Sequence, residues 1–294
     1  MQLDLFLDSH EVVLVNEAVV AVLEHDGLRA AAKVDELEHE RSDHPAVPIL
    51  KVLAGALTGW EPAAVETSAI ARRVAWLQQE VTPAAAAVLR GSAPAFLHPF
   101  LHELAEAARG LPYDSRHPDA HRARLCLLAG DDSGAEAAVL AIPNWIRNRD
   151  ALRWLSIARY RRDGLGAARG TLFQLAWGAP ATLPALLTEL DDALLMREWH
   201  AFEATCVWDS IPGEDLAAWF PAWYLIEHPG AAGEFRDMTL PDCPSAHAVR
   251  LLLRLLELEK QADVRALSAQ RARLRELNPD LFALYMVRRA VHHP

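Results

Sequence analysis

Cysteine is scarce in this sequence. The 294 residues include three cysteines, Cys126, Cys206 and Cys243, which are far apart and odd in number. They therefore form neither a CxxC metal pair nor an obvious disulfide framework. A reducing compartment fits this pattern best, and we expect the protein to be cytoplasmic.

Long apolar runs are also missing. No stretch of about 18 apolar residues is free of charges or breakers, so the sequence predicts no transmembrane helix and no membrane partner. The residues after Met1 include the acidic Asp4 and Asp8 and no basic segment, which argues against a cleaved signal peptide.

Positive charge is in the minority. The chain has 29 Lys and Arg against 40 Asp and Glu, a net charge of −11. The charge is uneven, because residues 1–110 and 181–244 are acidic while residues 111–180 and 245–294 carry a small positive excess. A phosphate backbone would be repelled unless the basic residues clustered on one face, so we expect no nucleic-acid partner.

Strand-like alternation is nearly absent, and helix signals dominate. The segment "EVVLVNEAVVAVLEH" carries valines at helical spacing, and a second helical pattern restarts after Gly27 and stops before Pro45, which predicts a helical hairpin. Further on, Thr82 followed by Pro83 predicts an N-cap with proline at the first helical position. The sequence therefore predicts an all-α fold.

The stretch "LLAGDDSGAEAAV" places acidic and hydroxyl side chains between two glycines. It lacks the alternating oxygens and closing glutamate of a calcium loop and the Lys-Ser/Thr pair of a phosphate-binding loop. A turn followed by an acidic helix cap explains it better. Aligning Gly134 with Gly166, 32 residues later, also aligns Asp131 with Asp163. We interpret this recurrence as a degenerate helical-hairpin repeat, whose units must stack to bury their apolar faces.

The second copy of this turn lies in "ARYRRDGLGAARGTLFQLAWGAP". This segment resembles tetratricopeptide-like repeats, with Tyr160, Gly164, Phe173 and Ala176 at the family's relative spacings and Pro180 within about a residue of its usual place. The resemblance implies a right-handed α-solenoid, a TPR-like superhelix of about six to eight stacked hairpins. The opening "QLDLFLDSHEVVLVNEAVVAVLEHD" resembles the start of a family of uncharacterised bacterial proteins, which implies no activity.

The segment "GLPYDSRHPDAHRA" is the best candidate linker. It places a domain boundary near residue 112. We expect N-terminal helical hairpins over residues 1–111 and TPR-like hairpins with C-terminal capping helices over residues 112–294, or one continuous solenoid.

Four histidines offer an alternative function. His98 and His102 are spaced i, i+4, with Glu106 four residues further, and His117 and His121 repeat the spacing. Such a cluster could build a zinc site, and hence a metal-dependent enzyme or a metal-binding regulator. The pattern is not HExxH, however, and a proline after His98 and after His117 fits two helix starts as well.

Other catalytic patterns are weak. The glycines of "DGLGAARG" are one residue off the dinucleotide fingerprint and follow a helical pattern, where a strand is needed. The acidic pairs and turn serines lack the partners that acid–base or nucleophilic catalysis requires. These residues are Asp191 and Asp192, Glu214 and Asp215, Ser133, and Ser210. We therefore expect no enzyme and no cofactor.

The segment "NWIRNRDALRWLSIARYRR" mixes tryptophan with arginine, the residue types that most often dominate interface energetics. We expect Arg149, Arg153, Trp154 and Arg161 to bind a partner, with the indole as an apolar anchor and the arginines pairing with acidic groups. The leading hypothesis is a non-enzymatic scaffold or adaptor for a protein or peptide, and homo-oligomer formation belongs to the same class. The alternative is that tryptophans fill gaps between helices while the arginines are solvated or paired within the chain.

Overall fold

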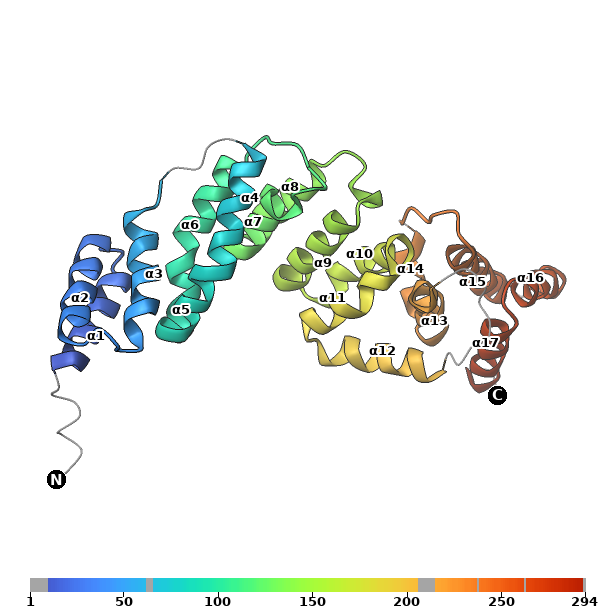
Figure 1. The fold of residues 1–294 in the computed structure, drawn as a ribbon. Helices are drawn as coiled ribbons and strands as arrows, with labels where there is room; N and C mark the ends of the chain where they lie inside the picture. The colour runs from blue at the N-terminus through green and yellow to red at the C-terminus, as the bar shows by residue number, and fades with distance from the viewer. Residues whose placement is uncertain (1–9, 62–65, 206–214, 237, 262, 293–294) are drawn as a thin grey trace, which may run out of the picture. The chain divides into compact units, whose positions relative to one another are not determined.

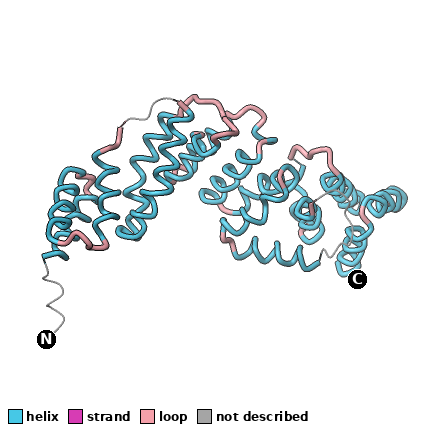
Figure 2. The backbone as a smooth tube through the Cα atoms, viewed as in Figure 1, coloured by secondary structure: helices cyan, strands magenta, loops and turns pink. Residues whose placement is uncertain are grey.

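The computed structural model describes residues 10–61, 66–205, 215–236, 238–261 and 263–292, and these residues form helices and loops without any strand (Figures 1 and 2). The predicted all-α class is confirmed. The chain divides into two compact units, residues 1–138 and 139–294. Residue 112, near which the sequence places a boundary, lies inside the first unit. Among the described helices none has the length and apolarity needed to cross a membrane.

The first unit is a succession of helices, with a long connection over residues 108–121 between the sixth and the seventh. They are α1 (His10–Leu23), α2 (Gly27–Glu40), α3 (Ala46–Thr58), α4 (Thr67–Trp76), α5 (Thr82–Leu89), α6 (Ala93–Ala107) and α7 (Arg122–Ala129), followed by α8 (Asp132–Leu140), which ends in the second unit. In this unit α1 packs on α2 and α3, and α6 packs on α7.

The predicted first hairpin is confirmed by α1 and α2. The Asp26 side chain caps α2 by accepting a hydrogen bond from the backbone N–H of Arg29 at 3.0 Å. The next residue, Gly27, lies so close to α3 that a Cβ atom there would be 2.8 Å from the Leu57 Cβ. This close approach brings the apolar faces of the three helices into one core, formed by Leu14, Ala18, Val34, Leu37, Val47 and Leu50.

The predicted helix start at Thr82 is wrong. Thr82 has helical dihedrals (φ −62°, ψ −47°), and a π-helical turn (Leu77–Val81) joins α4 directly to α5. In an α-helix Pro83 would lack its hydrogen bond and its ring would clash with the carbonyl four residues back. The wider π turn, in which the Thr82 N–H donates to the Leu77 carbonyl, accommodates the proline without ending the helix.

The glycine-rich segment between α7 and α8 is the predicted turn and cap. Gly130 adopts the left-handed conformation (φ 79°) that ends α7, and the N–H of Asp131 donates to the Cys126 carbonyl at 2.8 Å. The Asp131 carboxylate then accepts a hydrogen bond from the Gly134 N–H at 2.8 Å. The Asp131 carboxylate therefore serves the backbone at the start of α8.

The second unit is likewise helical. Its helices are α9 (Arg149–Asp163), α10 (Leu165–Gly178), α11 (Leu183–Leu190), α12 (Ala193–Thr205), α13 (Phe220–Glu227), α14 (Ala232–Arg236), α15 (Pro244–Gln261), α16 (Val264–Leu277) and α17 (Pro279–His292). Helices α9 and α10 form a tight hairpin (Figure 1), in which Gly164 makes the turn with φ 80°. The buried hydroxyls of Ser156 and Thr171 lie 2.9 Å apart and join the two helices.

Two glycine substitutions test the close approach of α2 to α3. We expect Gly27→Ala to lower the free energy of unfolding by about 1–3 kcal/mol, because its Cβ would overlap Leu57. Gly55→Ala, in the interior of α3 with no atom near the added Cβ, should raise it by about 0.5–1 kcal/mol. Urea unfolding of both variants measures the difference. Stabilisation by Gly27→Ala would contradict this account.

Candidate partner-binding sites

The four residues that the sequence places in a binding site on α9 differ in exposure and in their contacts, and they do not form one surface. Trp154 is 2% exposed and packs in the core of the second unit, so its ring is not offered to a partner. Arg153 is half-buried and forms an ion pair with Glu189 of α11. Arg149, with a side chain 70% exposed, lies 3.5 Å from Asp150, and Arg161 lies on the exposed surface near the other end of the helix.

The burial of Trp154 has a simple physical reason. Helix α9 packs against α10 and α11, and its buried residues are Ala151, Leu152, Trp154, Leu155, Ser156, Ile157 and Ala158. A tryptophan on such a helix fills the space between helices, as the alternative interpretation of the sequence proposes. This corrects the expected location of the aromatic anchor.

A small pocket elsewhere in the second unit combines apolar and polar groups. Its volume is about 130 Å³, and its lining comes from α10, α12 and α13. The lining residues are Leu165, Arg169, Leu172, Phe173, Leu194, Leu195, Arg197, Glu198, Phe220 and Tyr224. Leu172, Phe173 and Phe220 are each 1% exposed and belong to the core as well.

The polar residues of this pocket are held in place by other side chains. The Arg169 guanidinium lies 5.2 Å from the centroid of the Tyr224 ring and pairs with Glu234 at 2.6 Å. Glu198 lies 2.9 Å from the His228 imidazole, whose ring is 4.4 Å from that of Tyr224. Burial raises the pKa of the Tyr224 hydroxyl. The polar wall is therefore preorganised, and Tyr224 stays neutral.

Two exposed residues stand at the rim. Leu194 is 57% exposed, and the Arg197 side chain is 70% exposed and 3.5 Å from Glu198. An apolar cavity with a few fixed polar groups is the usual form of a binding site. The rim adds a cation that can pair with an acidic group beside whatever enters the pocket.

The larger hollows of the described surface are open grooves. One in the first unit has a volume of about 540 Å³ and is lined by Trp60, Arg72, Arg73 and Trp76 among others. Both indole N–H groups there are bound, to Glu103 at 2.7 Å and to Glu80 at 3.2 Å. This groove lacks the enclosure of the smaller pocket.

The four histidines of the metal hypothesis do not converge. His98 and His102 stack on the exposed side of α6 with ring centroids 5.9 Å apart. His121 is buried and caps α7, its Nδ1 accepting a hydrogen bond from the Ala123 N–H at 3.2 Å. Across the described ranges, which include all four, no group of three or more His, Cys, Asp or Glu could hold a metal ion.

In the described part of the chain, one residue of each acidic pair caps a helix. Asp192 caps α12 through the Leu195 N–H at 2.8 Å and accepts a hydrogen bond from the Tyr160 hydroxyl at 2.9 Å. Asp215 accepts one from the Ala217 N–H at 3.1 Å. Burial raises the pKa of the Cys126 thiol to about 11, so it stays protonated. Cys206, Ser210 and Glu214 lie outside the described residues.

Sequence reasoning missed the pocket. Its walls lie in three helices between residues 165 and 224, and the repeat-like spacing around Phe173 in the first of them indicates architecture, not a binding site. Comparison with protein-family models, with curated proteins and with solved structures finds no match for this chain. The chemistry of the pocket therefore carries the functional assignment.

The buried imidazole predicts a pH dependence of stability. Burial lowers the pKa of His121 from 6.5 to about 4, so between these values the unfolded chain binds a proton that the folded protein does not. We expect the free energy of unfolding to fall as the pH drops through this window, by up to about 1.4 kcal/mol per pH unit. His121→Asn keeps a capping oxygen but does not titrate, so the free energy of unfolding of this variant should fall less over the same pH range. Denaturant unfolding at several pH values measures both.

The exposed His102→Asn serves as a control for this comparison, because it removes an imidazole from the same part of the first unit without touching the α7 cap. Equal pH slopes for the wild type and His121→Asn would contradict the assignment of this titration to His121.

Proposed function

We propose that this protein is a non-enzymatic helical-repeat scaffold that binds a protein or peptide in the cytoplasm. Its architecture in this proposal is a right-handed, TPR-like α-solenoid of stacked hairpins. Two short turns support it, each with a glycine at positive φ: Gly130 precedes α8, and Gly164 precedes α10. Repeats of this kind stack side by side and present extended surfaces to their partners.

The observation that carries the binding proposal is the pocket of α10, α12 and α13. At about 130 Å³ it is well below the roughly 300–1,000 Å³ of sites for drug-sized ligands. A cavity of about 150 Å³ takes a group of the size of benzene. The pocket therefore suits one apolar side chain of a partner, of the size of leucine or phenylalanine.

The charge at the rim indicates which residue lies beside the apolar side chain of the partner. Arg197 is largely exposed, and its contact to Glu198 at 3.5 Å is long for a charge-assisted hydrogen bond. We infer a peptide segment in which Asp or Glu neighbours the apolar residue, so that the acid pairs with Arg197 while the side chain displaces water from the pocket. A polyanion is not the partner we propose, because the chain itself carries a net charge of −11.

A selection from a random displayed-peptide library against the full chain tests this function. We expect enriched peptides to share an apolar residue next to an acidic one. Leu194→Glu and Arg197→Glu should each weaken a selected peptide at least about tenfold, since each places a like charge at the rim. Fluorescence polarisation with the labelled peptide measures the dissociation constants.

Arg149→Glu is a matched control. Arg149 and Arg197 have equal side-chain exposure, 70%, and each lies 3.5 Å from the acidic residue that follows it. Loss of binding in Arg149→Glu with full binding in Arg197→Glu would move the site to α9, where the sequence places it. Failure of the selection to yield any shared motif would contradict peptide binding through the pocket.

A further inference from the structure

Helix α1 is apolar around most of its circumference. Leu14, Ala18, Ala21 and Val22 face the core of the first unit. On the opposite side Val13, Val20 and Leu23 are exposed, at 41%, 45% and 42% of their surface. A helix that is hydrophobic on all sides is normally covered on all sides. The outer face of α1 therefore lacks a covering element within the described residues.

The spacing of this outer face is that of a helix-pairing seam. Val13, Asn16, Val20 and Leu23 recur at alternating steps of three and four, the repeat with which two helices pack along each other. Asn16, which is exposed, is the one polar residue in the series. A single asparagine in such a seam sets the register of the pair at some cost in stability. We name these four residues the α1 seam.

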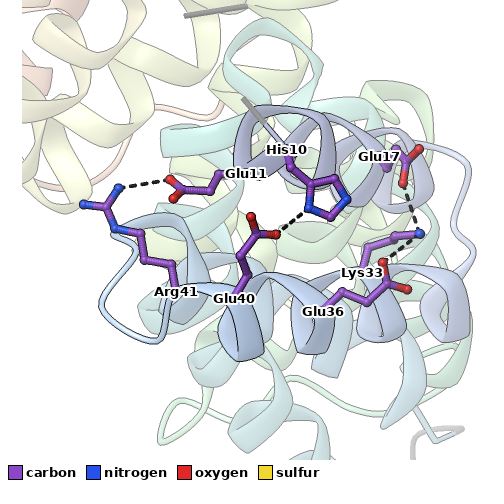
Figure 3. Close-up of polar contacts among 7 residues, drawn as sticks. All are labelled: His10, Glu11, Glu17, Lys33, Glu36, Glu40 and Arg41. Atoms are coloured by element: carbon purple, nitrogen blue, oxygen red, sulfur yellow. Dashed lines mark hydrogen bonds and ion pairs between the residues drawn. The ribbon is translucent and has the colours of Figure 1, made fainter. Parts of the chain in front are cut away.

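The charges beside the α1 seam are balanced. The seam borders a groove of about 490 Å³ between α1 and α2, whose lining includes Glu17, Arg29 and Lys33. Figure 3 shows the Lys33 ammonium group between the carboxylates of Glu17 of α1 and Glu36 of α2. The nitrogen lies 3.1 Å from Glu17 and 2.9 Å from Glu36, and Arg29 lies 2.7 Å from Glu24. The hydrogen bonds to Glu36 and Glu17 raise the pKa of Lys33, so its ammonium group stays charged at neutral pH.

We propose that the α1 seam binds the α1 seam of a second copy of this chain. Residues 1–110 are strongly acidic, yet the groove beside the seam carries both signs: it is lined by Glu17, Arg29 and Lys33, and Arg29 pairs with Glu24. A two-fold interface brings the same patch of each copy together, so it requires a patch that does not repel itself. The seam meets this condition, whereas a strongly charged partner would find no complement there.

The length of α1 limits the strength of the pair. Fourteen residues provide two heptads, about 21 Å of helix, so we expect a dimer with a dissociation constant in the micromolar range. The dimer does not depend on the pocket of the second unit. Its failure and the failure of peptide binding are therefore separate results.

Sedimentation velocity of the full chain over a series of concentrations tests the proposal. We expect the wild type to pass from monomer to dimer. In a parallel pair, the arrangement in which one asparagine sets the register, Val20→Glu places two glutamates against each other and should raise the dissociation constant at least about a hundredfold. Val13→Glu is the second variant. Circular dichroism establishes that both fold, as the exposure of these valines predicts.

Exposed valines elsewhere supply matched controls. Val264→Glu in α16 and Val287→Glu in α17, at positions 77% and 59% exposed, should leave the dimer unchanged. A wild type that stays monomeric at every concentration would overturn the proposal and leave the seam to a different protein. A dimer that resists both seam variants, or that the controls also dissociate, would overturn it too.

Discussion

The structure depends on the burial of one face of each helix against its neighbours. The helices of this chain range from 5 to 18 residues, and isolated helices of this length are marginal in water. Their stability therefore comes from packing, which in turn requires turns that reverse the chain within a few residues. Gly130 and Gly164 provide such turns with positive φ, and Asp26 and Asp131 cap the helices that follow. The hairpin is accordingly the smallest unit that both buries the apolar faces and provides hydrogen-bond partners at the helix ends.

The same constraint determines which residues remain for recognition. A helix with neighbours on several sides, such as α9, buries its tryptophan and pairs an arginine with the next helix. Side chains at the ends of helices stay exposed where three helices pack together and leave a gap between them. The pocket beside Arg169 and Tyr224 is such a place: its floor is core, and its rim is the solvent-exposed start of α12. Its recognition chemistry therefore lies at the edge of the packing.

Local signals in the sequence predict local structure well here. The predicted turns before α8 and α10 are correct, because Gly130 and Gly164 end the preceding helices at positive φ without help from distant residues. Thr82 and Pro83 carry an equally strong local signal, yet the helix continues through a π turn, since Leu77 and Val81 within that turn pack in the core. For Trp154 and for the pocket the outcome depends on which helices become neighbours. No local pattern contains that information.

The contrast between α1 and α9 shows why apolar content has to be weighed against which faces the neighbouring helices cover. Helix α9 is rich in arginine and yet buries seven residues in its contacts with α10 and α11. Helix α1 has a more apolar sequence but buries four residues, because its contacts with α2, α3 and α5 cover the one face that carries them. The apolar residues of α1 that stay exposed form a stripe with the spacing at which helices pair, and the charges beside this stripe are balanced. Leaving that stripe in water would cost roughly 25 cal/mol for each Å² of apolar surface. A second seam removes that cost without introducing an unpaired charge.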